Sequence, residues 1–308
     1  MGIAASTAEP ARAPEVRLDG QVAIVTGAGG GLGRSYAIAL ASRGARVVVN
    51  DVAGADDVAA EISATGGVAL PLTCSVATPS GGKQIVGAAL DAFGSVDAVV
   101  ANAGIMGRTA YQELSQEVLD RMLAVHLYGT LWVTQAAFTV MREKRYGRIV
   151  VTTSASALYG DADAHAYAAA KGAVFGLANS LALEGAPLGI LTNLLSPLAY
   201  TPMSAGSAPA ALSEVLDPDR VAPVVVYLAS SACTLNRTIV GAAAGLINRV
   251  FVASTAGWRS EAGAPSPEDV RDHLDEAVDP RAGYTLPGSV DEEAANVLVA
   301  VGAPSVSR

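Results

Sequence analysis

Residues 22–51 read VAIVTGAGGGLGRSYAIALASRGARVVVND, and this stretch decides the fold. Residues 22–26 and 47–51 are rich in β-branched apolar side chains, which is typical of buried strands, and a helix is predicted between them from Leu32 to about Arg43. A glycine-rich turn joins the first strand to the helix, and the second strand ends in Asp51. Such a turn alone is a weak signal, but a strand, turn, helix, strand and acid in this order predict a dinucleotide site.

Each part of this motif has an expected contact with a dinucleotide. Gly27 allows the tight turn, residues 29–31 let the backbone approach a pyrophosphate, and Gly33 lets the helix pack on the strand. The N–H groups at the start of the helix favour the phosphates. Asp51 is expected to bind the adenosine ribose hydroxyls and to repel a 2′-phosphate, so NAD is favoured over NADP. The alternative is that Asp51 is a helix cap or a loop acid.

Strands and helices continue to alternate along the chain. This predicts an α/β fold, a Rossmann-type doubly wound parallel sheet flanked by helices, as a single domain with a C-terminal extension. Further strands are expected at residues 68–73, 96–101, 149–153, 190–195 and near 238–241, with helices at 56–65, 80–93, 115–144, 164–184 and 217–229. The glycine-rich turn, Asn102, Ser154 and Pro197 all follow strand ends, where such sheets bind ligands.

Composition divides the chain into three parts. Residues 1–17 are rich in Ala and Pro and are expected to form a disordered leader, and residues 18–250 form the dinucleotide-binding domain. Residues 251–308 are expected to be an acidic C-terminal extension, irregular apart from a helix over 267–278. From Glu261 to Glu293 this extension holds ten acids against Arg271 and Arg281.

The totals of the chain exclude several kinds of partner. A net charge of −9 argues against nucleic acid and against anionic membranes. Cys74 and Cys233 fit neither a metal-ligand spacing nor a disulfide framework, so no metal is expected and a reducing cytoplasm is the expected compartment. We see no signal peptide and no apolar run of the roughly 18 residues that a membrane span needs. The expected partner is a small molecule.

Tyr167 and Lys171 lie four residues apart on the helix that follows the strand at 149–153, so they share one face. A phenol has a pKa near 10, and a neighbouring ammonium lowers it toward the range of acid/base catalysis. A hydroxyl from the preceding strand end, Ser154, can hydrogen-bond a substrate oxygen. Together they would act on a carbonyl or an alcohol, although this spacing of Tyr and Lys is also common on ordinary amphipathic helices.

These motifs together resemble the short-chain dehydrogenase/reductases over most of residues 20–250. The matching residues are Thr26-Gly27-x-x-x-Gly31-x-Gly33, Asn102-Ala103-Gly104, Ser154 and Tyr167-x-x-x-Lys171. Segments 27–36, 47–51, 125–129, 153–156 with 159–160, and 177–185 are similar to one branch, the (3R)-hydroxyacyl-CoA dehydrogenases, also described as type 4 17β-hydroxysteroid dehydrogenases.

The resemblance implies a role for each matching residue. Tyr167 is the general acid/base, Lys171 lowers its pKa and holds the nicotinamide ribose, Ser154 orients the substrate oxygen, and His126 completes the catalytic set. NAD is the implied cofactor, and the hydride passes between the substrate carbon and its nicotinamide ring. The implied cofactor-binding residues are Gly27, Gly31, Leu32, Gly33, Asp51, Ser75, Val76, Asn102, Ala103, Gly104, Tyr167, Lys171, Pro197 and Thr201.

The chain departs from the wider family at several positions. His126 stands where most members have an Asn that holds a relay water; the branch also has His there, and its imidazole serves either a relay or packing. Cys74 replaces an Asp that contacts the adenine, and Ala101 replaces an Asn. Residues 198–203, which border the substrate in the family, also differ from the branch pattern. The substrate of this chain therefore need not be that of the branch.

Three functions are compared. The first is an NAD-dependent dehydrogenase for a secondary alcohol on a hydrophobic substrate, with a (3R)-hydroxyacyl-CoA favoured and Arg237, Arg249 and Arg259 available for its phosphates. The second is a dehydrogenase for a steroid or another ketone without CoA. The third is an NAD-binding regulator, which is disfavoured because Ser154, Tyr167 and Lys171 are all retained. The two long helices at 115–144 and 164–184 resemble those through which the family forms homodimers and homotetramers.

Overall fold

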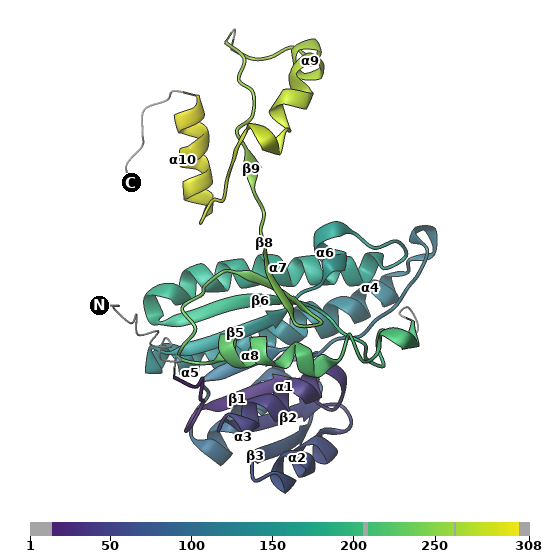
Figure 1. Cartoon of the computed structure of the whole chain (residues 1–308), viewed down its shortest axis with the longest axis vertical. Helices are drawn as coiled ribbons and strands as arrows, with labels where there is room; N and C mark the ends of the chain where they lie inside the picture. Colours follow the sequence, from purple (N-terminus) through teal and green to yellow (C-terminus); the bar gives the residue numbers. More distant parts are fainter. Residues whose placement is uncertain (1–13, 206–208, 262, 302–308) are drawn as a thin grey trace, which may run out of the picture. The chain divides into compact units, whose positions relative to one another are not determined.

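Parallel strands organise the chain, and the computed structural model describes residues 14–205, 209–261 and 263–301. The sheet has the spatial order β3-β2-β1-β4-β5-β6-β7-β8 (Figure 1). Its strands are β1 (Val22–Thr26), β2 (Arg46–Asp51), β3 (Val68–Thr73), β4 (Ala98–Ala101), β5 (Gly147–Thr152), β6 (Ile190–Leu198), β7 (Ile239–Ala243) and β8 (Leu246–Val250).

Strands β1 to β7 pair in parallel with their neighbours. The strand order reverses at β1, which lies between β2 and β4, and in such sheets ligands bind beside the reversal, at the carboxyl ends of the strands. Every residue of β1 and β5 is buried, as expected for parallel strands with helices on both faces. The prediction of a doubly wound parallel sheet is confirmed.

Helices cover both faces of the sheet (Figure 1). On one face α1 packs against α2 and α8, and on the other α5 packs against α3 and α7. The bounds are α1 (Gly31–Ser42), α2 (Ala55–Ala64), α3 (Pro79–Phe93), α4 (Gln116–Leu123), α5 (Gly129–Lys144), α6 (Ala155–Tyr159), α7 (His165–Gly185) and α8 (Ala222–Ala229). The core under α1 and α8 includes Leu40, Val49, Val100 and Val225, all fully buried.

The structure differs from the sequence-based prediction in two helices. The single helix expected over 115–144 is α4 and α5, joined by a π-helical segment, Ala124–Tyr128, that contains His126. Ser115 does cap its start, accepting a hydrogen bond from the Val118 amide (3.3 Å). Asp217 caps only the short 3-10 turn Pro218–Arg220, and α8 begins after it.

Strand β8 was not expected from the sequence. It follows β7 after a two-residue turn, Ala244 and Gly245, whose φ angles of +52° and +84° are both left-handed. Turns of this kind suit tight hairpins but favour Asn-Gly, so the Ala-Gly pair gave little signal.

The leader was expected to be disordered to residue 17, and the structure describes its last residues. Val16 packs against the core, Glu15 pairs with Arg43, and the next residue, Leu18, is buried with its amide bonded to the Arg43 carbonyl (2.8 Å). Residues 1–13 of the expected leader lie outside the described part.

The chain divides into two compact units, Met1–Asn248 and Arg249–Arg308. In the second unit, β9 (Ser254–Thr255) pairs antiparallel with β10 (Tyr284–Thr285). The helix expected over 267–278 is α9 (Pro267–Ala277), and α10 (Val290–Ala300) and the two short strands are further regular elements in a region expected to be irregular. No residue of α9 or α10 is buried. Within the described ranges, no helix has the length and apolar character to cross a membrane.

Candidate active site

A cavity of about 450 Å³ lies at the carboxyl ends of the strands. All the residues predicted for catalysis or for cofactor binding line it. They come from the glycine-rich turn, from the π-helical segment before α5, from α7 and from the ends of several strands. The sheet therefore brings together residues that lie up to 174 positions apart, from Gly27 to Thr201 (201 − 27 = 174).

The glycine-rich turn leaves no room for larger residues. Gly27 has a φ of +64°, and a Cβ on it would lie 2.6 Å from the Ala103 Cα. A Cβ on Gly33 would lie 2.0 Å from the Gly27 carbonyl oxygen. Gly30 precedes α1 and offers no side-chain cap, so the N–H groups of its first turn remain for a ligand. The turn has the shape that a pyrophosphate site requires.

Asp51 and Asn102 fix this turn from neighbouring strands. The Asp51 carboxylate accepts hydrogen bonds from the backbone amides of Gly29 (2.8 Å) and Val52 (2.6 Å). Asn102 donates from its side chain to the carbonyls of Thr26 and Gly27 (both 3.1 Å). Asp51 therefore holds the turn and also lines the cavity, so its negative charge lies beside the glycine-rich turn.

Ser154, Tyr167 and Lys171 converge at the other end of the cavity. Ser154 follows β5 and caps α6, accepting a hydrogen bond from the Ser156 amide (3.2 Å). Tyr167 and Lys171 lie on the buried face of α7 with 8% and 4% exposure. The Lys171 ammonium donates to the Thr152 carbonyl (2.6 Å) and lies 6.0 Å from the Tyr167 ring centre.

Burial shifts the pKa values of both groups. It lowers the pKa of Lys171 to about 7. It also raises the pKa of Tyr167, and a hydrogen bond with Ser154 opposes this only in part, while the Asp161 carboxylate adds to it. Desolvation of the phenolate is thus the largest effect on the Tyr167 pKa in the free protein, and the expected lowering of this pKa by Lys171 stays a prediction.

His126 forms part of the cavity wall. It is 1% exposed, and its ring meets the Tyr167 ring edge-on, with centres 5.3 Å apart. Nε2 lies 2.8 Å from the Ile105 carbonyl oxygen and 3.2 Å from the Ile105 amide nitrogen, so both backbone groups of Ile105 face this ring nitrogen, while Nδ1 has no partner among the described residues. Burial, and then the charge of Lys171, lower the pKa of His126 to about 3, so the imidazole is neutral. Both the relay and the packing interpretation stay open.

The mouth of the cavity is apolar. Met106, Leu198 and Met203 line it and are exposed by 37%, 58% and 45%. Leu198 ends β6, and the loop that follows it is held by Ser204, whose hydroxyl accepts from the Thr201 amide (2.8 Å) and donates to the Ala199 carbonyl (2.9 Å). An apolar rim next to the Ser154 and Tyr167 hydroxyls suits a hydrophobic substrate with one reactive oxygen.

Sequence reasoning missed three features of this site. Thr152 is one of the residues that line the cavity, and the Ser204 hydroxyl accepts a hydrogen bond from the Thr201 amide. Arg108 makes a two-pronged ion pair with Asp161 (both 3.0 Å), which also accepts from the Ser156 hydroxyl (3.2 Å). Thr152 could have been found from its place two residues before Ser154, whereas the ion pair joins two loops and leaves no local pattern.

Comparison with known proteins agrees with this geometry. A sequence model described as short chain dehydrogenase matches residues 21–210. The chain belongs to the short-chain dehydrogenase/reductase family. It is thus an oxidoreductase enzyme, and the resemblance seen in its motifs is confirmed.

Three relatives show how far the similarity extends. A protein of Mycobacterium tuberculosis named as a short-chain type dehydrogenase/reductase is 43% identical over 270 residues, 84% of this chain and 94% of that protein. A hydroxyacyl-CoA dehydrogenase of the same organism is 34% identical over 253 residues, 75% of this chain and 80% of that protein. The structure of full-length peroxisomal multifunctional enzyme type 2 from Drosophila melanogaster matches with a TM-score of 0.81 and 34% identity, covering 93% of this chain and 50% of that one. This chain therefore spans half of that multifunctional enzyme.

Proposed function

We propose that this protein is an NAD-dependent dehydrogenase that interconverts a secondary alcohol and a ketone on a hydrophobic substrate, with a (3R)-hydroxyacyl-CoA favoured. The observation that carries this proposal is the convergence of Ser154, Tyr167 and Lys171 at one end of a cavity whose other end is the glycine-rich turn. A tightly packed turn for a pyrophosphate and an acid/base group for an alcohol lie in the same cavity.

The lining of the cavity supports NAD rather than NADP. Asp51 lies where the family binds the adenosine ribose, and its carboxylate would repel a 2′-phosphate. Among the described residues that line the cavity there is no arginine, and Lys171 lies at the Tyr167 end. When bound, NAD would supply the hydride acceptor. Gly27, Gly33 and Asp51 would hold its adenosine and phosphates, and Lys171 would hold the nicotinamide ribose.

The protein's own side chains would bind the substrate oxygen and transfer its proton. Ser154 and Tyr167 would hydrogen-bond that oxygen, and Tyr167 would accept its proton during oxidation and return it during reduction. Because burial raises the pKa of Tyr167 and lowers that of Lys171, both are neutral over part of the ordinary pH range. Lys171 would favour the phenolate whenever it is protonated.

The substrate is chosen from the rim and from the named relatives. Met106, Leu198 and Met203 favour an apolar substrate, and one relative is named a hydroxyacyl-CoA dehydrogenase. A steroid or another substrate without CoA is the runner-up. Arg237 does not serve CoA phosphates here: it precedes β7 at the amino-terminal edge of the sheet, opposite the cavity, with its amide bonded to the Thr192 carbonyl (2.8 Å).

Compartment and assembly belong to the same proposal. Cys74 and Cys233 are free thiols, which suits a reducing compartment such as the cytoplasm. The chain is proposed to form a homodimer or a homotetramer through the long helices α4–α5 and α7, as family members do. Gel filtration with light scattering of the purified protein checks the assembly, and a monomer contradicts it.

The experiment follows NADH absorbance with purified protein, NAD and a substrate panel, with NADP in parallel. The panel holds 3-hydroxyacyl-CoAs of both configurations, 17β-hydroxysteroids and simple secondary alcohols. Turnover of the (3R)-acyl-CoAs with NAD supports the proposal, and turnover of steroids alone moves the substrate to the runner-up. If no substrate of the panel is turned over although NADH still binds, the result favours the third function, an NAD-binding regulator.

Two tyrosine variants test the catalytic assignment. Tyr167→Phe is expected to lower kcat by about 10²- to 10⁴-fold, because the proton acceptor is lost. Tyr159→Phe is the matched control, since Tyr159 lies on α6 near the site but is 73% exposed. Full activity of the Tyr167 variant would contradict the mechanism.

A further inference from the structure

Several buried polar atoms have no hydrogen-bond partner among the described residues, and they fall into two groups. Thr152 Oγ1, His126 Nδ1 and Asn50 Oδ1 belong to residues that line the cavity. Residues outside it hold the others, which are Gln21 Oε1, the Tyr36 hydroxyl, Thr192 Oγ1 and Glu293 Oε2. A buried hydroxyl without a partner costs free energy, and such a group on a cavity wall can recover it from a ligand.

Thr152 is the hydroxyl in the first group. It is the last residue of β5 and is 7% exposed, and its backbone carbonyl accepts the hydrogen bond of the Lys171 ammonium (2.6 Å). The backbone of Thr152 therefore lies beside the group proposed to hold the nicotinamide ribose. A hydroxyl both donates and accepts, so it suits ribose hydroxyls or a carboxamide equally.

The sheet order separates Thr152 from the adenosine end of the cavity. Asp51 ends β2 and Thr152 ends β5, with β1 and β4 between them. Three strand spacings amount to roughly 14 Å, which is the scale of a dinucleotide and not of one nucleoside. A contact from Thr152 therefore falls on the nicotinamide half.

We propose that the Thr152 hydroxyl binds the nicotinamide riboside half of the dinucleotide, as a cofactor contact beside Lys171 and Ser154. This inference rests on the proposed binding of NAD. Thr152 is left unpaired within the protein and becomes paired when the cofactor is bound. Removing its hydroxyl then has opposite effects on the free protein and on the complex.

Thr152→Val tests this contact because valine keeps the β-branched shape and loses only the hydroxyl. NADH fluorescence titration should show a Kd about 3- to 10-fold higher, the loss of one hydrogen bond, while the Kd for ADP stays unchanged. The free protein should melt at the same or a higher temperature, since a buried unpaired hydroxyl is gone. Thr152→Ser should bind NADH nearly as the parent does.

Thr192→Val is the matched control. Thr192 is also a fully buried strand threonine with an unpaired hydroxyl, but it does not line the cavity. It should share the effect on melting temperature and leave the NADH Kd unchanged. A loss of NADH affinity in both threonine variants would overturn the proposal, because it would show a general distortion of the sheet.

Two further outcomes separate this proposal from the one on which it rests. Equal NADH affinity of the parent and Thr152→Val overturns the Thr152 contact and leaves the proposed function standing. A parent protein that binds ADP but not NADH overturns the proposed function, and the Thr152 contact with it.

Discussion

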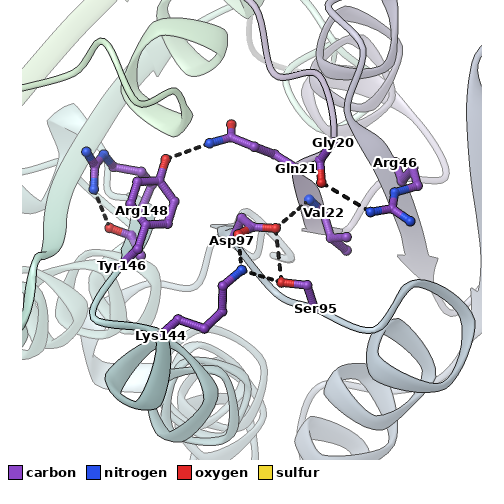
Figure 2. Close-up of polar contacts among 10 residues, drawn as sticks. Gly20, Gln21, Val22, Arg46, Ser95, Asp97, Lys144, Tyr146 and Arg148 are labelled. Atoms are coloured by element: carbon purple, nitrogen blue, oxygen red, sulfur yellow. Dashed lines mark hydrogen bonds and ion pairs between the residues drawn. The ribbon is translucent and has the colours of Figure 1, made fainter.

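At the amino-terminal edge of the sheet, the buried Asp97 carboxylate accepts hydrogen bonds from the Val22 amide (2.8 Å) and the Ser95 hydroxyl (3.1 Å) and pairs with Lys144 (Figure 2). At the carboxyl edge, buried Lys171 has one carbonyl as its partner and no carboxylate among the described residues. The same sheet thus pairs the buried Asp97 carboxylate with an opposite charge at the amino ends of its strands. At the carboxyl ends it holds Lys171 with one backbone carbonyl as hydrogen-bond partner.

Other buried polar groups at the amino-terminal edge also have hydrogen-bond partners, as Asp97 does. Arg148 is 7% exposed, donates to the carbonyls of Ser230 (3.1 Å) and Gly147 (2.9 Å), and stacks 4.5 Å from the centre of the Tyr146 ring. The Tyr146 hydroxyl accepts from the Gln21 side chain (2.7 Å) (Figure 2). These bonds tie the starts of β1, β4 and β5 together, so this edge contributes stability.

The carboxyl edge keeps polar groups that a purely structural site would pair or replace. Burial lowers the pKa of both Lys171 and His126, and the Thr152 hydroxyl has no partner in the described chain. Groups held in this way are ready for a ligand or a proton at the expense of stability. The difference between the edges teaches that this fold separates the residues that stabilise it from those that react.

Lys171→Met should produce the largest effect and sharpen this comparison. Turnover should fall by about 10²- to 10⁴-fold, because the ribose and the phenolate lose their cation. The Lys171 pKa is about 7 in the folded protein and 10.5 when unfolded, so from pH 7 to about 10 only the unfolded chain binds this proton and stability rises with pH. The variant should lose that rise in thermal melts of the cofactor-free protein.

Lys144→Met is the matched control at the other edge. It should leave turnover unchanged and destabilise the protein, because Asp97 loses its ion-pair partner. If both lysine variants lowered turnover alike, the separation of the two edges would be wrong.

Asp97→Ala should have the next largest effect. The Val22 amide and the Ser95 hydroxyl lose their acceptor, and we expect a loss of about 1–3 kcal/mol in the free energy of unfolding, measured in urea. Activity per folded molecule, measured below the transition, should equal that of the parent. A lower kcat in folded molecules would show that the amino-terminal edge also acts on the chemistry.

The sequence predicted most of what depends on local patterns. Apolar strands, the glycine-rich turn and the Tyr167–Lys171 pair each leave a signal within a few residues, and the sheet then places them together. The π-helical segment at His126 leaves none, and the contacts of His126 there are with Ile105 and Tyr167, which lie 21 and 41 positions away (126 − 105 = 21 and 167 − 126 = 41).

The pKa of a buried group and its hydrogen-bond partners also could not be predicted from the sequence, because they depend on every segment that surrounds the group. The direction of the Tyr167 pKa follows from burial, which many segments create together. The missing partner of Thr152 can be known only when every neighbour is placed.

The Arg108–Asp161 pair should give the smallest effect, on the pH dependence of turnover. Asp161 raises the pKa of Tyr167, and its own pKa is lowered by Arg108, so it stays ionised in any ordinary assay. Asp161→Asn removes a negative charge and should move the rise of kcat/KM for alcohol oxidation to lower pH. Arg108→Gln leaves the carboxylate uncompensated and should move it to higher pH.

Both displacements should stay below about one pH unit, since the pair is partly exposed, by 44% at Arg108 and 27% at Asp161. Ser154, by its hydrogen bond, and Asp161, by its charge, shift the Tyr167 pKa, while Lys171 and neutral His126 lie against the Tyr167 ring. Of these four groups only Asp161 is changed here. Arg34→Gln, which breaks an exposed ion pair with Glu61 on α1 and α2, is the control and should not move the profile. Opposite displacements in the two variants identify a charge effect on Tyr167; displacements in the same direction would mean that the pair only holds its two loops together.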